Sequence, residues 1–165
     1  MSKTTVRGGE KAQKKMGELV DDLNNSIKTL EVGFFSTAKY PPVATGMKGG
    51  RKQTPHPVTL IAAWNELGNA RIPARPFMRP AAHNAIPLIK TMLKQHLNGN
   101  QFGFTKQTAN LTGTLVQNAI QTKITSLKTP PNTDRTIKRK GSSNPLIDTG
   151  FLRQTVTWAL DGQQQ

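Results

Sequence analysis

The sequence predicts an α+β fold in which long helices pack on a small, mostly antiparallel sheet. Apolar residues recur at steps of three and four along 11–30, 81–97 and 108–127, which is the spacing of an amphipathic helix. Two short stretches, 30–35 and 154–160, instead combine apolar and β-favouring residues and indicate strands. These strands have to pair across almost the whole chain, and so small a sheet needs cover from helices or neighbouring subunits.

The N-terminal third is predicted to contain an arm, a helix, a strand and a loop. Residues 1–10 are polar and basic, and we expect a flexible arm there. From Lys11 to Leu30 an apolar helix face is formed by Met16, Leu19, Val20, Leu23, Ile27 and Leu30. After the strand at 30–35, glycines and prolines predict a loop over 36–57 with the basic centre GMKGGRK. This loop is either simply exposed or a basic finger that contacts a phosphate backbone or becomes ordered on assembly.

The order of residues from Trp64 to Ala82 indicates a segment with a defined backbone shape. A helix over 58–67 should end at Gly68, because glycine tolerates the left-handed conformation. Three rigid turns are predicted at Pro73, Pro76 and Pro80, with Arg71, Arg75 and Arg79 between them and Ile72, Phe77 and Met78 as apolar anchors. Rigid arginines suit carboxylates, phosphates or a neighbouring subunit. The alternative is a proline-rich connection with solvated arginines.

The C-terminal half continues with two helices, a loop and a strand. The helix over 81–97 contains Pro87, which predicts either a kink or a later start of the helix. Gly113 weakens the prediction of the helix over 108–127. Thr129–Asn144 is rich in proline, serine and basic residues and predicts a loop carrying Lys138, Arg139 and Lys140. Asp148-Thr149-Gly150 predicts a turn or cap before the half-buried strand. We expect one domain over 11–160 and a polar tail over 161–165.

The charge balance is strongly positive. The 165 residues include 23 Lys and Arg against 9 Asp and Glu, a net charge of +14, and positions 67–133 contain no acidic residue. Such an excess implies a polyanion or an acidic partner and says nothing about fold. Apolar residues make up 35% and aromatic residues 5%, which is lean for a compact monomer, so we expect partners to contribute to stability.

The residues argue against an enzyme. The absence of cysteine excludes disulfides, thiol catalysis and cysteine metal sites, and His56, His83 and His96 are scattered without metal-ligand spacing. We therefore expect no catalytic residue, no metal and no cofactor. No zinc finger or RNP motif is present, so DNA contact would be nonspecific and salt-sensitive. No apolar run is long enough to span a membrane, and we expect a soluble protein made in the cytoplasm.

Three segments resemble a known family. They are VGFFSTAKYP (32–41), IAAWNELGNARIPARPFMRPA (61–81) and NPLIDTGFLRQTVTW (144–158), which cover about a quarter to a third of the chain. They are similar to the small neck or tail-completion proteins, the minor tail component group, of long-tailed double-stranded DNA bacteriophages. The family elements are N-E-x-G leading into I-P-x-R-P-F, and P-L-x-D-T-G-x-L-R near the C-terminus. They match Asn65, Glu66, Gly68, Ile72, Pro73, Arg75, Pro76 and Phe77, then Pro145, Leu146, Asp148, Thr149, Gly150, Leu152 and Arg153.

The resemblance implies a ring-forming subunit of the head–tail junction that joins tail to capsid around the DNA channel. The implied partners are further copies of the chain and other neck, connector, tail terminator or tail tube proteins, with possible nonspecific contact to channel DNA and none to a membrane. The implied location is the virion, after assembly in the host cytoplasm. The stretch 98–144 matches no family element, which leaves the position in the junction open.

The hypothesis for the site has two parts. The Arg71–Arg79 loop docks onto a neighbouring subunit or ring, with Phe77 as its apolar anchor. The expected subunit interface comprises Trp64, Arg71, Arg75, Phe77, Arg79 and Arg153, and the expected contact with DNA or an acidic partner comprises Lys48, Arg51, Lys52, Lys138, Arg139 and Lys140. The competing class is a free-standing DNA-binding or packaging-associated protein. An enzyme such as a nuclease comes third, because it needs a carboxylate cluster that the sequence does not suggest.

Overall fold

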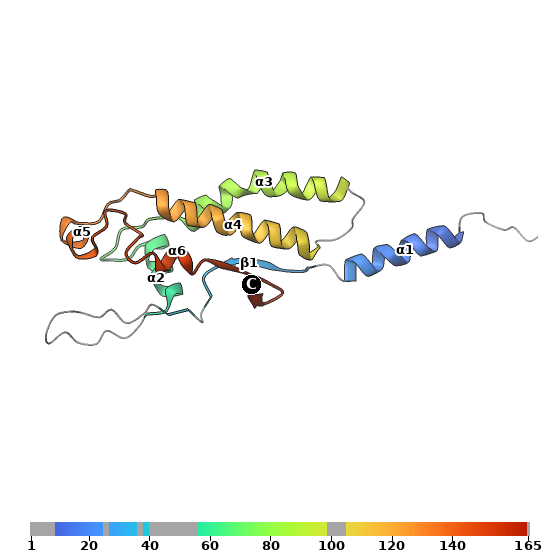
Figure 1. The fold of residues 1–165 in the computed structure, drawn as a ribbon, viewed down its shortest axis with the longest axis horizontal. Helices are drawn as coiled ribbons and strands as arrows, with labels where there is room; N and C mark the ends of the chain where they lie inside the picture. The colour runs from blue at the N-terminus through green and yellow to red at the C-terminus, as the bar shows by residue number, and fades with distance from the viewer. Residues whose placement is uncertain (1–8, 25–26, 36–37, 40–55, 99–104, 165) are drawn as a thin grey trace, which may run out of the picture.

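The computed structural model describes residues 9–24, 27–35, 38–39, 56–98 and 105–164. Helices α3 and α4 form one layer and lie side by side above the sheet, while α1 extends away from one end and α2, α5 and α6 gather at the other (Figure 1). No helix in the described ranges is long and apolar enough to cross a membrane. The elements are α1 (Gly9–Asn24), β1 (Leu30–Gly33), α2 (Val58–Leu67), α3 (Met78–Asn98), α4 (Lys106–Ser126), α5 (Asp134–Lys140), α6 (Phe151–Gln154), β2 (Thr157–Leu160) and β3 (Gln163–Gln164).

The sheet is antiparallel, in the order β1-β2-β3. Leu30 is opposite Leu160 and Gly33 is opposite Thr157, which confirms the predicted pairing across the chain. The expectation of a half-buried strand is wrong, since Trp158, Ala159 and Leu160 are buried in succession. Both faces of β2 are therefore covered.

The last residues form a hairpin where we expected a polar tail. Asp161 and Gly162 connect β2 to β3 with φ of 47° and 81°, and Leu160 pairs with Gln163. Positive φ at both central residues is typical of a type I′ turn, for which Asp-Gly is a favoured sequence. The Asp161 carboxylate oxygen Oδ1 also accepts hydrogen bonds from the backbone N–H groups of Lys28 (3.1 Å) and Thr29 (2.8 Å). The turn is thereby tied to the chain just before β1.

Two apolar clusters make the core. The larger joins α2, α4, α6 and the start of α3 through Val58, Ala62, Phe77, Ala81, Ile120, Ile124, Leu127, Leu146, Leu152 and Val156. The smaller packs Trp158 and Leu160 of β2 on Ala109 of α4. A Cβ at Gly113 would lie only 2.6–3.0 Å from atoms of the Trp158 indole. Gly113, which argued against a helix in the sequence, lets the indole lie directly on α4.

Two helix boundaries differ from the predicted ones by three residues or more. Helix α1 ends at Asn24 rather than at Leu30, because Ile27 and Leu30 pack against the Trp158 cluster instead. Helix α3 begins at Met78, so Pro80 lies in its first turn and does not make a third loop turn. The N–H that Pro80 lacks costs little stability there, since the first-turn N–H groups have no partner within the helix.

The basic segment 129–144 is not wholly a loop. It contains α5, which ends at Gly141 in the left-handed conformation with φ of 68°. Lys138, Arg139 and Lys140 form the last turn of this helix, where cations interact favourably with the helix dipole. The cluster therefore has a defined helical geometry rather than that of an exposed loop.

We expect Gly113→Ala to lower the free energy of unfolding by about 1–3 kcal/mol, because the new methyl group would overlap the indole. Gly17→Ala in α1 is the matched control, since nothing lies within 4 Å of its Cβ position and alanine favours the helix. Urea unfolding followed by tryptophan fluorescence measures both. Equal midpoints for the two variants would show that Trp158 does not rest on Gly113.

The hydrogen bonds that Thr29 and Lys28 donate to the Asp161 carboxylate hold the pKa of this carboxyl below its usual range. A lowered pKa in the folded state stabilises the protein above the unfolded pKa of about 4, and this stabilisation is lost as the pH falls through the folded value. We expect Asp161→Asn, which keeps the turn preference, to be less stable than the parent near neutral pH. The difference should vanish in acid. Urea unfolding across this pH range tests it, and a pH-independent difference would contradict it.

Candidate interaction site

The loop between α2 and α3, residues 68–77, is held by the carboxylate of Glu66. The N–H groups of Phe77 and Met78 donate to Oε2 at 2.7 and 2.9 Å, and that of Arg79 donates to Oε1 at 3.1 Å. These N–H groups belong to the first turn of α3, where a negative charge is favoured. Glu66, in the last turn of α2, thus caps α3 and holds the two ends of the loop together.

The backbone of this loop closes on itself. Gly68 has φ of 75°, and a Cβ there would lie 2.7 Å from the nitrogen of Ala74. The N–H of Arg75 donates to the carbonyl of Asn65 at 2.6 Å. The side-chain oxygen of Asn69 accepts from the N–H groups of Arg71 (2.8 Å) and Ile72 (2.9 Å). These contacts give the loop a hydrogen-bonded backbone, and the expectation that it holds one shape stays a prediction.

Phe77 anchors the loop to the core of its own chain. Its side chain has no exposed area, and its ring meets that of Phe34 edge-on at 6.0 Å between centroids. The expectation that Phe77 inserts into a neighbouring subunit is therefore wrong. An aromatic ring flanked by prolines and arginines indicates an anchor, but the pattern does not say which chain it enters.

Arg75 is also turned inward. Only 5% of the residue is exposed. Its Nε donates to the carbonyl of Pro130 at 2.8 Å, and Nη2 donates to the carbonyl of Pro131 at 3.1 Å and to the side-chain oxygen of Asn132 at 3.0 Å. Burial lowers the pKa of its guanidinium. Arg75 therefore joins the loop to residues 130–132, and its assignment to a subunit interface is wrong.

The C-terminal resembling segment, 144–158, meets the segment 61–81 at this point. The side-chain amide of Asn132 donates to the carbonyl of Pro145 at 3.4 Å. The Nζ of Lys140 donates to the carbonyls of Asn144 (3.1 Å) and Pro145 (3.2 Å). We call Arg75, Asn132, Lys140 and Asn144 the polar network. Lys140 serves this network, so its assignment to DNA contact does not match its hydrogen bonding.

Asn144 connects the polar network to the end of α4. Its amide donates to the carbonyls of Ile124 (3.4 Å) and Thr125 (2.7 Å), which have no partner within the helix. Its side-chain oxygen accepts the N–H groups of Leu146 (2.9 Å) and Ile147 (3.1 Å). Sequence reasoning missed this role, although asparagine before a proline is a common signal for such side-chain to backbone bonds.

Two cations thus lie close together behind the surface. Burial is the main cause that lowers the pKa of Lys140, and the charges of Arg75 and Arg139 lower it further, while Asp148 opposes them. Arg75 and Lys140 are bonded to neutral oxygen atoms. At this end of the molecule, positive charge is therefore carried by side chains below the surface as well as by exposed ones.

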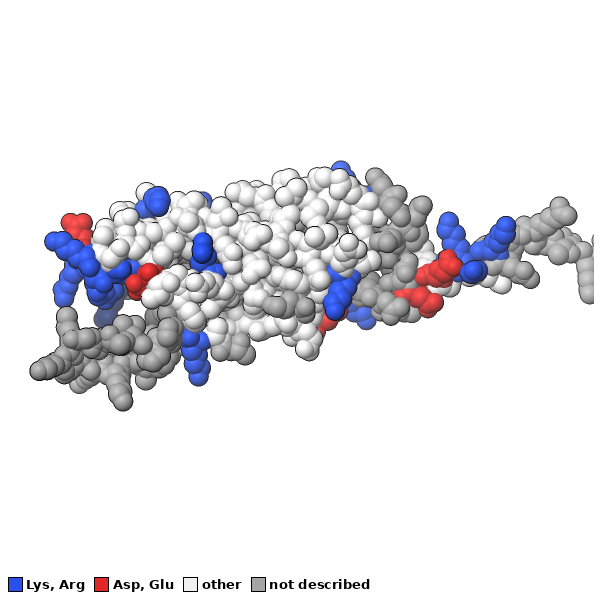
Figure 2. Space-filling model, in the orientation of Figure 1, with Lys and Arg blue, Asp and Glu red and all other residues white. Residues whose placement is uncertain are grey.

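The remaining predicted residues that the structure describes are on the surface. Arg71, Arg79, Arg153, Lys138 and Arg139 are exposed. Trp64 is partly buried and meets the ring of His56 edge-on at 5.7 Å. Figure 2 shows lysine and arginine side chains gathered at the end that carries α5, whereas the middle of that face has few charges. Lys48, Arg51 and Lys52 lie outside the described residues.

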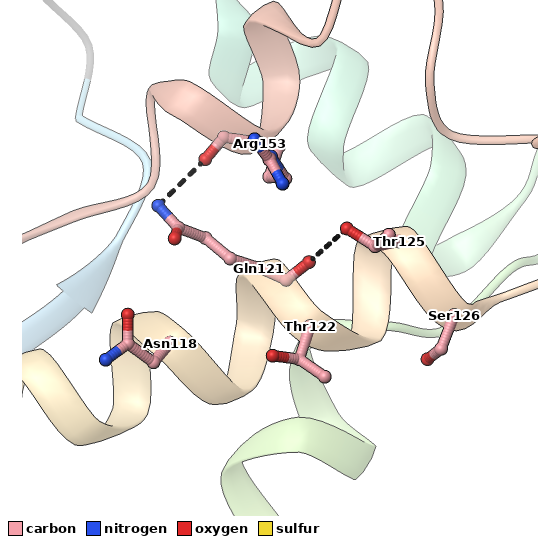
Figure 3. Close-up of a pocket in the computed structure, with 6 residues that line it drawn as sticks. All are labelled: Asn118, Gln121, Thr122, Thr125, Ser126 and Arg153. Carbon is pink, nitrogen blue, oxygen red and sulfur yellow. Dashed lines mark hydrogen bonds between the residues drawn. The ribbon is translucent and has the colours of Figure 1, made fainter.

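Arg153 lines a shallow cavity of about 410 Å³ on the outer side of α4 (Figure 3). The other lining residues are Asn118, Gln121, Thr122, Thr125 and Ser126. Gln121 donates to the carbonyl of Arg153 at 3.2 Å, and the Thr125 hydroxyl donates to the carbonyl of Gln121 at 2.9 Å. The lining contains no acid–base pair. Over the described ranges, no group of three or more His, Cys, Asp or Glu side chains could hold a metal.

Comparisons of the chain with protein-family models, with curated proteins and with solved structures find no significant match.

We expect Arg75→Lys to lower the free energy of unfolding by about 2–4 kcal/mol, because an ammonium group cannot reproduce the planar fork and buried acceptors are left without donors. Arg71→Lys is the control and should change stability by less than about 0.5 kcal/mol, since Arg71 is exposed. Chemical denaturation of both variants measures the effect. A tolerated lysine at position 75 would show that the polar network does not hold the fold together.

Proposed function

We propose that this chain is a structural subunit of the head–tail junction, a neck or tail-completion ring, of a long-tailed double-stranded DNA phage. In this role it joins the tail to the capsid around the DNA channel. The observation that carries the proposal is that Arg75, from one resembling segment, and Asn144 and Pro145, from the other, meet through the polar network. The two motifs thus belong to one folded unit, as a family signature requires.

Exposed apolar side chains within the described part of the chain support a role as a subunit. Met16 and Leu67 are 63% and 61% exposed, and Leu88 and Leu111 are 54% and 56% exposed. Single exposed apolar residues are normal on a monomer. Here they stand beside a lean core, and a ring offers several contacts per copy in which to bury them.

The exposed cations define the proposed contacts. Arg71 projects from the loop that Glu66 and Arg75 hold, Arg79 projects from the first turn of α3, and Arg153 projects from α6. These three are the proposed interface with a neighbouring subunit or ring. Lys138 and Arg139 at the end of α5 are proposed to face channel DNA or an acidic partner ring, and electrostatic attraction of this kind weakens with salt.

A free-standing nonspecific DNA-binding or packaging-associated protein is the second candidate. The exposed cations of α5 favour it, as does the absence of acidic residues from 67 to 133. It requires tight binding to bare duplex, with a steep loss of affinity as salt rises.

The mass of the purified protein, free of nucleic acid, separates the two candidates. We expect a discrete oligomer, or a monomer that forms a ring with other junction proteins, at both low and high salt. Duplex binding should be weak. Light scattering and a fluorescence titration with a duplex of arbitrary sequence measure the two properties.

Glu substitutions at Lys138 and Arg139 serve as the control, because they should remove residual duplex binding without changing the mass. A protein that stays monomeric or dimeric with every partner, and moves completely onto bare duplex, would overturn the junction role in favour of the DNA-binding one.

A further inference from the structure

The polar network holds a lysine amine next to a carboxamide. The Nζ of Lys140 donates to the carbonyl of Pro145 at 3.2 Å, and the side-chain nitrogen of Asn132 donates to the same oxygen at 3.4 Å. Two nitrogen atoms that share one acceptor are neighbours. Lys140 and Asn132 therefore lie side by side, although α5 separates them along the chain. Groups held together in this way react far faster than the same groups free in solution.

The hydrogen bonds of Lys140 suit a nucleophile. A neutral lysine amine has two hydrogen atoms and one lone pair. The bonds to the carbonyls of Asn144 (3.1 Å) and Pro145 (3.2 Å) use both hydrogen atoms, so the lone pair is left for attack on a carbon atom. Burial, joined by the charges of Arg75 and Arg139, lowers the pKa of Lys140, and a lower pKa increases the neutral fraction of the amine.

Asn132 is held as an electrophile. Its Oδ1 accepts a hydrogen bond from Nη2 of Arg75 at 3.0 Å. A guanidinium at this oxygen stabilises the negative charge that develops there when a nucleophile adds to the carboxamide carbon. Hydrogen bonds to an sp² oxygen lie near the plane of the amide. The bond from Arg75 therefore does not occupy the face from which an amine attacks.

Asn144, the other carboxamide of the polar network, lacks these features. Its oxygen accepts only from the neutral N–H groups of Leu146 and Ile147. Its nitrogen donates to the carbonyls of Ile124 and Thr125, and loss of that nitrogen would leave both carbonyls without this donor. The geometry therefore selects Asn132 as the partner of Lys140.

We propose that Lys140 and Asn132 form an isopeptide bond within one chain. The Nζ adds to Cγ of Asn132, and the bond from Cγ to Nδ2 then breaks. The lysine nitrogen loses one proton, and the departing nitrogen gains one and leaves as ammonia, so no oxidant or further reactant is needed. Asp148 follows the turn whose carbonyls hold the amine, and its charge acts on Lys140. Its carboxylate carries the proton from one nitrogen to the other.

The bond goes beyond the proposed function and does not depend on it. It replaces one of two neighbouring cations with a neutral amide, which removes the repulsion between Lys140 and Arg75. It also ties the end of α5 to the connection before this helix. Arg75 and the exposed cations of α5 keep this end of the molecule positive.

The role of Asp148 is tested by the rate of ammonia release. Cell-free synthesis supplies a newly made chain, and intact mass is followed over time. Asp148→Asn should slow the release about tenfold or more. Asp134→Asn is the matched control, because Asp134 is an exposed acid in the first turn of α5, and its rate should equal that of the parent. Equal rates for the two variants would overturn the assignment of Asp148 as the base.

Mass spectrometry of the purified protein tests the bond itself. We expect the mass of the folded chain to lie below that of its sequence by one ammonia. Trypsin should release residues 129–135 joined to residues 140–153 as one branched peptide, because a bonded Lys140 is no longer a cleavage site. Lys140→Arg and Asn132→Asp should each show no loss of ammonia.

Three results would overturn the proposal. The first is a full mass after prolonged incubation of the folded protein at neutral pH. The second is a loss of ammonia that persists in Lys140→Arg, since a succinimide formed by an asparagine alone would explain it. The third is a loss of ammonia confined to residues 140–153, which would place the bond at Asn144 instead.

Discussion

The buried guanidinium of Arg75 is the interaction on which the other parts of this fold depend. A cation taken out of water has to be given acceptors, and the carbonyls of Pro130 and Pro131 with the Asn132 side chain supply them. Those acceptors lie more than fifty positions away along the chain. Satisfying Arg75 therefore brings together the loop before α3, the connection after α4 and, through Asn132, the start of the C-terminal block. Glu66 complements it by setting where α3 begins.

This arrangement changes the roles assigned to the residues of the resembling segments. Glu66, Arg75, Phe77 and Pro145 all lie in the resembling segments, and each is engaged inside its own chain. Their chemistry explains how the loop and α5 are presented. The proposed contacts with other molecules involve exposed side chains instead, such as Arg71, Arg79 and Lys138. A motif of this kind identifies a fold more directly than it identifies a binding surface.

The parts of the fold that local sequence signals determine were predictable, and the parts that depend on distant partners were not. Helices α2, α3 and α4 and the β1–β2 pairing were predictable, because apolar periodicity and strand character are local signals. Helix α5 and the Asp161-Gly162 hairpin were missed because polar composition was weighed above Gly141 and the Asp-Gly turn, both readable locally. The partners of Arg75 and Phe77 could not be predicted, since a proline carbonyl or an aromatic ring carries no mark of its distant partner.

The charge distribution limits how such a chain can associate with itself. Arg75 and Lys140 place positive charge beneath the end of the molecule that also displays Lys138 and Arg139, and residues 67–133 offer no acid to offset it. A two-fold contact that joined two such ends would place like charges against each other at a cost of several kcal/mol. Residues 16–24 of α1 are the richest stretch of negative charge in the chain, with three of the nine acidic residues. Self-association that pairs this stretch with a basic surface must join unlike faces, and joining unlike faces is the geometry from which rings are built.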